Sequence, residues 1–250
     1  MNDSPSNTLL KCSYRMRLDA NKLSSDLLKK TLKISHAYNP LDYAWEPHKE
    51  FIKRYGNLGA RVILLGMNPG HGMGNTGIPF GCPEQVKEYL QITNLKVKQP
   101  KLLHPKRPVY GLNCPKPEIS GRRLWGLLSD LYGTAENALS KLYVMNHFPL
   151  WLFNESGQNI TPNKLEIDAS KELFERCNKN LVDVIEALYA KRVICVGIYA
   201  KKMAINAIQK AELKGITVEK IPHPSPANPL ANKENGNVWK KIAAAVITGE

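Results

Sequence analysis

The chain has 250 residues, of which 43% are hydrophobic and 23% are charged, and this composition excludes a wholly disordered protein. Its length is compatible with one α/β domain. The 35 Lys and Arg residues outnumber the 22 Asp and Glu residues, and the net charge of +13 favours a polyanionic partner such as nucleic acid over an acidic protein.

The N-terminal residues 1–20 are expected to form a loose arm, and residues 21–250 a single domain. The first helix is predicted over Asn21–Ile34, where leucines recur on one face. Residues Met1–Thr8 are polar and unlike a signal peptide, and the longest apolar stretches are shorter than the about 20 residues that span a bilayer. We therefore expect an intracellular protein without a membrane segment, located in the nucleus if its source is a eukaryote.

Four short apolar runs along the chain predict β-strands, at Arg61–Leu65, Leu142–Met145, Arg192–Val196 and Ile216–Ile221. The first three are rich in Val, Ile and Leu without alternation, as is typical of a strand that is buried on both faces. The fourth run contains a charged pair, so we expect it near an edge of the sheet.

Helical patterns lie between these strands and after the last one, at Pro83–Ile92, Gly121–Leu131, Lys164–Tyr189, Lys201–Ala211 and Asn237–Ile247. Buried strands that alternate with helices predict parallel pairing through right-handed crossovers. The expected fold is therefore α/β, a three-layer α/β/α sandwich with a central, mostly parallel four-stranded sheet.

The chain has five cysteines but no C-x-x-C motif, which supports neither a disulfide framework nor a four-thiolate metal or iron-sulfur site. We expect no metal and no cofactor. The glycine-rich segment 66–81 lacks the Gly-Lys-Ser/Thr of a Walker A loop and the G-x-G-x-x-G spacing of dinucleotide sites, so nucleotide cofactors are disfavoured.

Polar side chains follow three of the predicted strands, in the loops where open α/β sheets bind ligands. Asn68 lies in the glycine-rich loop after the first strand, Asn146 directly follows the second, and His223 follows the last. Each residue alone is compatible with a structural role, such as shaping a turn or capping a strand. Together they are expected to converge on one pocket.

Four segments of the chain resemble the family of single-strand-selective monofunctional uracil-DNA glycosylases, in the same order and at similar spacing from about Trp45 to Trp239. They are GMNPGHGMGNTGIPFG from Gly66, HPKRPVYGLNCPKPEISGRRLWG from His104, the strand end at Asn146, and HPSPANPLANK from His223. The first loop is one residue shorter after Gly70 than in the family pattern.

This resemblance implies hydrolysis of the N-glycosidic bond of a uracil flipped out of DNA. Asn68 would orient water, and His223 would donate a hydrogen bond to uracil O2 as negative charge develops there. Asn146 would pair with O4 and N3–H, and Phe80 would stack on the base. The remaining substrate-binding residues that the resemblance implies are Met67, Gly70 and Met73.

DNA contacts are expected from the segment after the last strand and from a basic stretch in the middle of the chain. Ala227 stands where the family commonly has Arg and is too short to enter the base stack, which predicts weaker activity on duplex than on single strands. Leu230 could serve as the wedge instead, or could be an ordinary loop contact. The expected DNA-binding residues are Pro224, Ser225, Pro226, Ala227, Asn228, Leu230, Lys233, Lys106, Arg107, Arg122 and Arg123.

Two alternatives to a uracil-specific enzyme stay open at this point. One is a related glycosylase of different base specificity, and the other is a non-catalytic DNA-binding relative, which the presence of both Asn68 and His223 disfavours. No Lys lies near the expected base-binding residues to form a Schiff base with the sugar, so strand cleavage is not expected. Uracil-containing DNA, single- or double-stranded, is the expected partner, and no obligate protein partner is implied.

Overall fold

A four-stranded parallel sheet forms the centre of the computed structural model, which describes residues 3–249. Its strands are β2 (Val62–Gly66), β3 (Leu142–Asn146), β6 (Arg192–Val196) and β7 (Thr217–Ile221), in the order β3-β2-β6-β7. All neighbouring pairs are parallel, and the last residues of β2 and β3, Gly66 and Asn146, are paired. All four predicted strands are confirmed, as is the edge position of β7.

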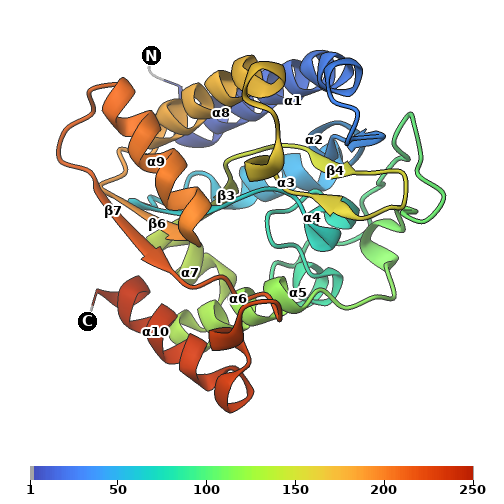
Figure 1. Ribbon diagram of the computed structural model, residues 1–250. Coiled ribbons are helices and arrows are strands. Elements are labelled where there is room, and N and C mark those ends of the chain that lie inside the picture. Colours follow the sequence, from blue (N-terminus) through green and yellow to red (C-terminus); the bar gives the residue numbers. More distant parts are fainter. Residues whose placement is uncertain (1–2, 250) are drawn as a thin grey trace.

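Helices cover both faces of this sheet, which confirms the three-layer sandwich (Figure 1). On one side lie α8 (Ile167–Ala187) and α9 (Ile198–Lys210), with α1 (Pro5–Lys30) packed on α8. On the other side lie α6 (Ile119–Tyr132), α7 (Ala135–Lys141) and α10 (Asn237–Thr248). The buried Val, Ile and Leu side chains of the inner strands fill the space between these layers.

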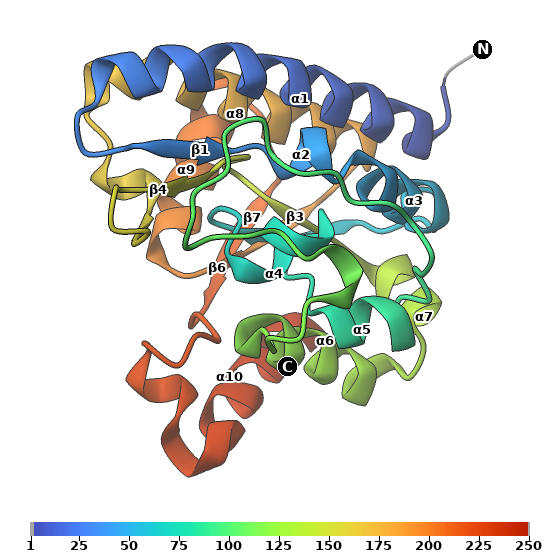
Figure 2. The same ribbon diagram turned by 90° about the vertical axis from the view of Figure 1, so that its right-hand side faces the viewer.

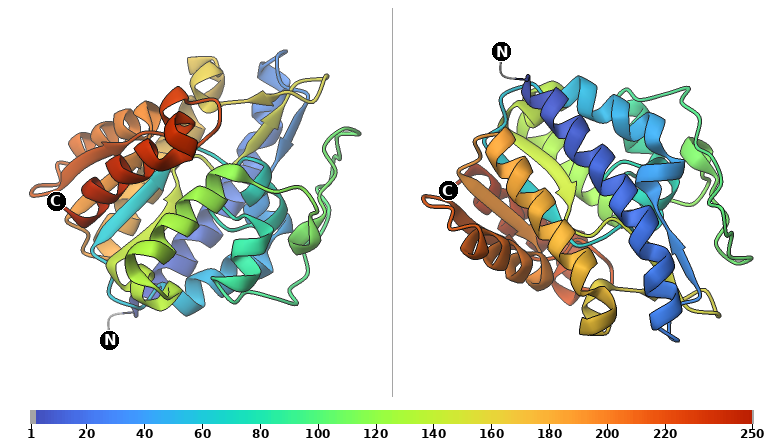
Figure 3. Two further views of the ribbon diagram at one scale, coloured as in Figure 1. Left: turned by 90° about the horizontal axis from the view of Figure 1, so that it is seen from below. Right: turned by 90° about the horizontal axis from the view of Figure 1, so that it is seen from above.

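The expectation of a loose N-terminal arm is wrong for residues 5–20. These residues are the first part of α1, which is capped by Ser4 and packs along α8 (Figure 3). Its buried residues are Leu9, Cys12, Met16, Ala20, Leu23 and Leu27. This apolar stripe recurs about every three or four residues and starts well before the predicted first residue of the helix, which also ends at Lys30 rather than Ile34. Residues 1 and 2 of the expected arm lie outside the described residues.

The remaining predicted helices all occur, with bounds shifted by a few residues. The shift is largest for α5 (Pro83–Glu88), which ends before the predicted Ile92. The additional helices are α2 (Pro40–Tyr43), α3 (Trp45–Tyr55) and α4 (His71–Thr76), and the short 3-10 helices are η1 (Gly111–Asn113), η2 (Pro162–Lys164), η3 (Pro229–Ala231) and η4 (Lys233–Gly236). No helix within residues 3–249 combines the length and the apolar character that crossing a membrane requires.

A second, antiparallel sheet was not anticipated. It consists of β1 (His36–Tyr38), β4 (Trp151–Phe153) and β5 (Asn159–Ile160), in the order β1-β4-β5. Figure 2 shows β1 and β4 below α1, on the side of the molecule that also carries α4. The strand β5 and the residue after it, Thr161, supply lining residues to the site described next.

Candidate active site

The carboxyl ends of β2 and β3 meet at a glycine that leaves room for two functional side chains. A Cβ atom added to Gly66 would lie 2.1 Å from Oδ1 of Asn146 and 2.7 Å from Cε2 of Phe80. Only a residue without a side chain therefore permits the amide and the aromatic ring to come together at this strand end. The strand β7 ends at Ile221, and Pro222 and His223 follow it directly.

One cavity of about 560 Å³ opens at these strand ends. The structure brings together in its lining all the residues predicted to bind or transform the base, which are Met67, Asn68, Gly70, Met73, Phe80, Asn146 and His223. Of the residues expected to bind DNA, Ser225, Ala227 and Asn228 line the same cavity. The convergence that strand order predicted for three separate segments is thus present in the fold.

His223 is a neutral imidazole with a defined tautomer. Its Nδ1 atom accepts a hydrogen bond from the backbone N–H of Ser225 at 3.1 Å. Only an unprotonated ring nitrogen can accept, so the proton of the neutral ring resides on Nε2, which becomes the donor. Burial lowers the pKa of His223 below its ordinary value, which keeps the ring neutral at physiological pH.

Asn146 is held in one orientation by a sulfur atom. Its Nδ2 atom donates to Sδ of Met73 at 3.2 Å. A thioether sulfur can accept a hydrogen bond but cannot donate one, so this contact directs the amide nitrogen toward Met73 and the amide oxygen toward Gly66. The cavity therefore presents a donor and an acceptor in a fixed order, as recognition of a pyrimidine edge requires.

Asn68 presents its amide oxygen as the atom that can receive a hydrogen bond from water. The amide nitrogen is engaged, because it donates to the backbone oxygen of Pro69 at 2.9 Å. An amide oxygen can orient a water molecule but cannot take up its proton. Asn68 is therefore suited to positioning and unsuited to general base catalysis.

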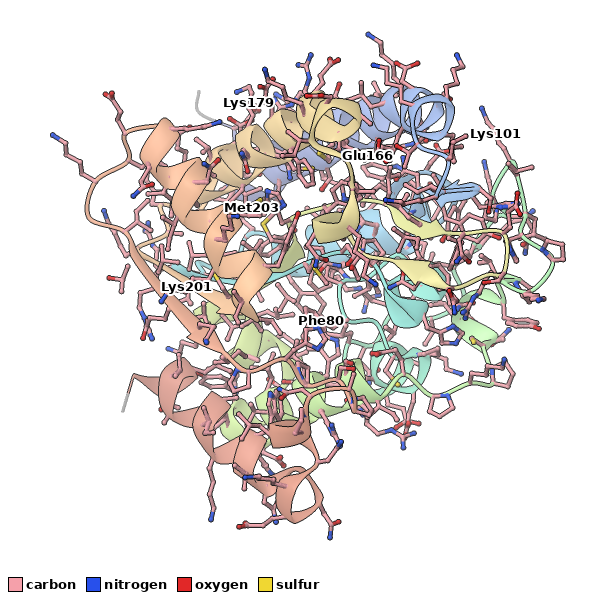
Figure 4. All side chains as sticks on the ribbon, viewed as in Figure 1. Phe80, Lys101, Glu166, Lys179, Lys201 and Met203 are labelled. Carbon is pink, nitrogen blue, oxygen red and sulfur yellow. The ribbon has the colours of Figure 1, made fainter. Side chains whose placement is uncertain are left out.

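Phe80 forms an aromatic wall that α6 holds in place. The backbone oxygen of Phe80 accepts a hydrogen bond from Nε1 of Trp125 at 3.1 Å, and a Cβ atom on Gly121 would lie 1.9 Å from that oxygen. Phe80 itself has a positive φ of 54°, a conformation that such fixed contacts maintain. The ring lies between the sheet and α6, 6.4 Å from the His223 ring between centroids (Figure 4).

Six further residues line the cavity that sequence reasoning did not select, namely Pro69, Gly72, Glu118, Ser120, Asn159 and Thr161. Glu118 gives the cavity a carboxylate, although the glycine-rich loop has none. Both of its oxygens accept backbone N–H groups at the start of α6, from Ser120 and Gly121, and burial raises its pKa. No sequence signal indicated Glu118, because Glu is not among the residues that commonly cap the start of a helix. Asn159 begins the two-residue strand β5 and Thr161 directly follows it, and a strand this short gives no pattern that could be predicted.

Of the basic residues expected to contact phosphate, Arg107 and Arg122 donate hydrogen bonds within the protein, whereas Lys106 is exposed. Arg107 donates to the backbone oxygen of Gly157 at 2.5 Å, and Arg122 donates to Glu84 at 2.6 Å. Lys106 is exposed and lines, together with Arg107 and Pro226, an adjoining hollow of about 350 Å³ that shares Glu118, Ser120 and Ser225 with the main cavity.

The other residues expected to bind DNA do not line the main cavity. Leu230 is 37% exposed, and Lys233 is exposed at the start of η4. Pro224 is buried, and its backbone oxygen accepts a hydrogen bond from Arg123 at 2.7 Å. Among residues 3–249, no three His, Cys, Asp or Glu side chains are grouped so that they could hold a metal ion.

Comparison with known proteins agrees with the residue pattern. The model of the uracil DNA glycosylase superfamily matches residues 53–246. The single-strand selective monofunctional uracil DNA glycosylase of Bos taurus is 40% identical over 207 residues, which are 82% of this chain and 74% of that protein. The Rattus norvegicus protein of the same description is 41% identical over 201 residues, covering 78% of this chain and 70% of that one.

Solved structures include a similar fold. The crystal structure of wild-type Pedobacter heparinus SMUG2 has a TM-score of 0.62 with 18% sequence identity, and the match covers 86% of this chain and 87% of that chain. The family match spans most of the chain. The Bos taurus and Rattus norvegicus relatives are 40% and 41% identical to it, more than twice the identity of the solved structure. The chain therefore belongs to the uracil-DNA glycosylase superfamily.

Proposed function

We propose that this protein is a monofunctional DNA glycosylase that flips uracil into the cavity and hydrolyses its N-glycosidic bond, leaving an abasic site. The observation that carries the proposal is the presence of Asn68, Phe80, Asn146 and His223 in one cavity. Its substrates are uracil-containing single and double strands of DNA, in the nucleus if the source is a eukaryote. Base excision repair is the process that uses this reaction.

Recognition of the base is assigned to Asn146 and Phe80. The amide nitrogen of Asn146 donates to uracil O4 and its oxygen accepts from N3–H, while the Phe80 ring stacks on the base. Cytosine has a donor in place of O4 and no proton on N3, so its edge is mismatched at both positions. Leaving buried polar groups unpaired can give discrimination by factors of about 10⁴.

Bond cleavage is assigned to stabilisation of the departing base. As the bond between C1′ and N1 breaks, its electron pair stays with uracil and the sugar becomes cationic. The Nε2–H of His223 donates to O2, where the negative charge accumulates, and a preorganised donor of this kind lowers the barrier by about 3 to 4 kcal/mol. Water oriented by Asn68 then attacks C1′ and releases a proton to the uracil anion or to solvent.

One assay tests this proposal. The protein is incubated with a uracil-containing single strand in the presence of a chelator, and released base and strand integrity are measured. Free uracil together with an uncut abasic strand is expected. Release of thymine or a damaged purine but not uracil would indicate another branch of the superfamily, and DNA binding without release of any base would indicate a non-catalytic relative.

Excision is expected to be slower from duplex than from single strands. Flipping a base from a duplex requires a side chain to fill the gap in the stack, and Ala227, exposed at the cavity mouth, is too short to do so. Ala227→Arg should raise the rate on duplex while changing the single-strand rate less than twofold, and Leu230→Ala should lower the duplex rate. Equal wild-type rates on the two substrates would contradict this account.

Uracils with a substituent at C5, such as 5-hydroxymethyluracil, are also proposed substrates. A Cβ atom on Gly70 would have no neighbour within 4 Å, so the cavity has free space at this point. Because Gly70 has a negative φ of −112°, Gly70→Ala should fold without strain and fill that space. We expect excision of 5-hydroxymethyluracil to fall about tenfold, in line with the cost of a misfitted methyl group.

The expected rate of uracil excision by Gly70→Ala is within about threefold of the wild type. Gly126→Ala, on α6 and outside the cavity lining, is the matched control and should leave both rates unchanged. A parallel loss of uracil and 5-hydroxymethyluracil excision by Gly70→Ala would contradict the assignment of this space to the C5 substituent.

A further inference from the structure

The helix α6 is attached to both walls of the base-binding cavity. Through Trp125 it binds the backbone oxygen of Phe80 at 3.1 Å, and through Arg123 it binds the backbone oxygen of Pro224, next to His223, at 2.7 Å. The stacking ring and the hydrogen-bond donor thus come from segments far apart in the sequence but share one support. Their ring centroids are 6.4 Å apart.

The segment that carries His223 depends on side-chain hydrogen bonds for its conformation. Asn228 donates through Nδ2 to the backbone oxygen of His223 at 2.7 Å, and Asn232 donates to that of Pro226 at 2.7 Å. Trp239 of α10 donates to the backbone oxygen of Pro222 at 2.7 Å. These contacts join the segment to itself and to α10, so a connection to the opposite wall of the cavity must come from elsewhere.

Arg123 supplies that connection. Its Nη1 atom donates to Pro224 and its Nη2 atom donates to Oδ1 of Asn232 at 3.3 Å, so one guanidinium joins both ends of the segment to α6. The adjacent Arg122 differs, because its side chain is 55% exposed and pairs with Glu84. These two neighbouring arginines of one basic stretch therefore make different contacts.

We propose that Arg123 is a positioning residue, which sets the place of the His223 donor relative to the Phe80 wall rather than binding a DNA phosphate. A planar guanidinium is suited to this task, because its donors reach two acceptors in a fixed geometry. Misplacing a reacting group by about 1 Å can cost about a hundredfold in rate. The inference rests on the proposed role of His223.

The test is single-turnover excision of uracil from a single strand by Arg123→Ala over a range of enzyme concentrations. We expect the maximal rate to fall by about tenfold to a hundredfold, and the half-saturating concentration to change less than threefold. Arg123→Lys should recover part of the rate, because an ammonium group can still reach the oxygen of Pro224. Arg176→Ala on α8 is the matched control, since it removes one positive charge from a surface pair with Glu172 and should leave the rate unchanged.

The salt dependence of binding separates the two roles of an arginine. Loss of a phosphate contact lowers the slope of log affinity against log salt by about 1, whereas Arg123→Ala should keep the wild-type slope. The imidazole ¹⁵N signals of His223 should shift in Arg123→Ala and stay unchanged in Arg176→Ala. A reduced slope and weaker binding with an unchanged maximal rate would overturn the proposal.

Two outcomes are kept apart by the design. If Arg123→Ala does not fold, the same measurements on Arg123→Gln decide, because glutamine removes the charge and keeps an N–H donor; a wild-type maximal rate in that variant with a reduced salt slope counts against the proposal. Wild-type protein that releases no uracil would refute the proposed function itself. If the wild-type protein releases uracil and Arg123→Ala releases it at the same rate, only the role of Arg123 is refuted.

Discussion

Replacing His223 with alanine is expected to lower the maximal rate of uracil excision from single strands by about a hundredfold to a thousandfold. The Nε2–H group of this residue is fixed as a donor by the contact of Nδ1 with Ser225, and no reorganisation is needed when charge develops on the base. Binding to DNA without uracil should change only a few fold, because the ring interacts with the base rather than the strand. Single-turnover kinetics at saturating enzyme measure this effect.

His36→Ala is the control for this substitution, since His36 lies in the small antiparallel sheet and outside the cavity lining. It should retain the wild-type rate within about twofold. Full activity of His223→Ala would show that another group stabilises the departing base.

The pH profile provides an independent check on His223. Burial lowers the pKa of its imidazole from the ordinary value of 6.5, so the ring is already neutral above that pH. If the neutral form donates the hydrogen bond, the rate stays constant as the pH rises from 7 to 8.5. A rate that fell tenfold with each pH unit would mean that the imidazolium ion is required.

The second large effect is expected from Asn146→Asp. The substitution keeps the size of the side chain but replaces the amide nitrogen, which donates to O4, with an oxygen that repels it. Excision of uracil should fall by a factor of about 10³ or more, and the ratio of uracil to cytosine excision should fall with it, because an oxygen can accept from the amino group of cytosine. Rates on single strands that contain one or the other base measure both quantities.

Asn154→Asp introduces the same charge in the turn between β4 and β5 and does not alter the cavity lining. It should leave both rates as in the wild type. An Asn146→Asp protein with the wild-type preference for uracil would mean that the base is selected by other groups.

The central sheet was predictable because its strands are buried on both faces. The apolar runs Val-Ile-Leu-Leu at 62–65 and Val-Ile-Cys-Val at 193–196 are incompatible with a solvent-exposed surface. The strands predicted from them agree with the observed β2 and β6 to within one residue at each end. Asn68, Asn146 and His223 were brought together by the rule that parallel strands end at one edge of the sheet. Their individual roles come from the family resemblance and stay predictions.

Other features depend on contacts that no local pattern reveals. Residues 5–20 of α1 were missed because the side chains that continue its apolar stripe, Cys12, Met16 and Ala20, are weak apolar signals until they pack on α8. Among the basic residues, composition does not distinguish Arg123, which binds backbone and amide oxygens within the chain, from a side chain that contacts phosphate. Charge in the sequence identifies a class of partner and does not assign each residue its contact.

The central claim is that Asn146 and His223 hold an extruded uracil against the Phe80 ring. A crystal structure of Asn68→Ala bound to a uracil-containing single strand tests it most directly, because the slowed variant retains the intact base. The account predicts the base stacked on Phe80, with O4 and N3–H bonded to Asn146 and O2 within hydrogen-bond distance of Nε2 of His223. A base that lies outside this cavity, or one whose O2 faces away from His223, would contradict it.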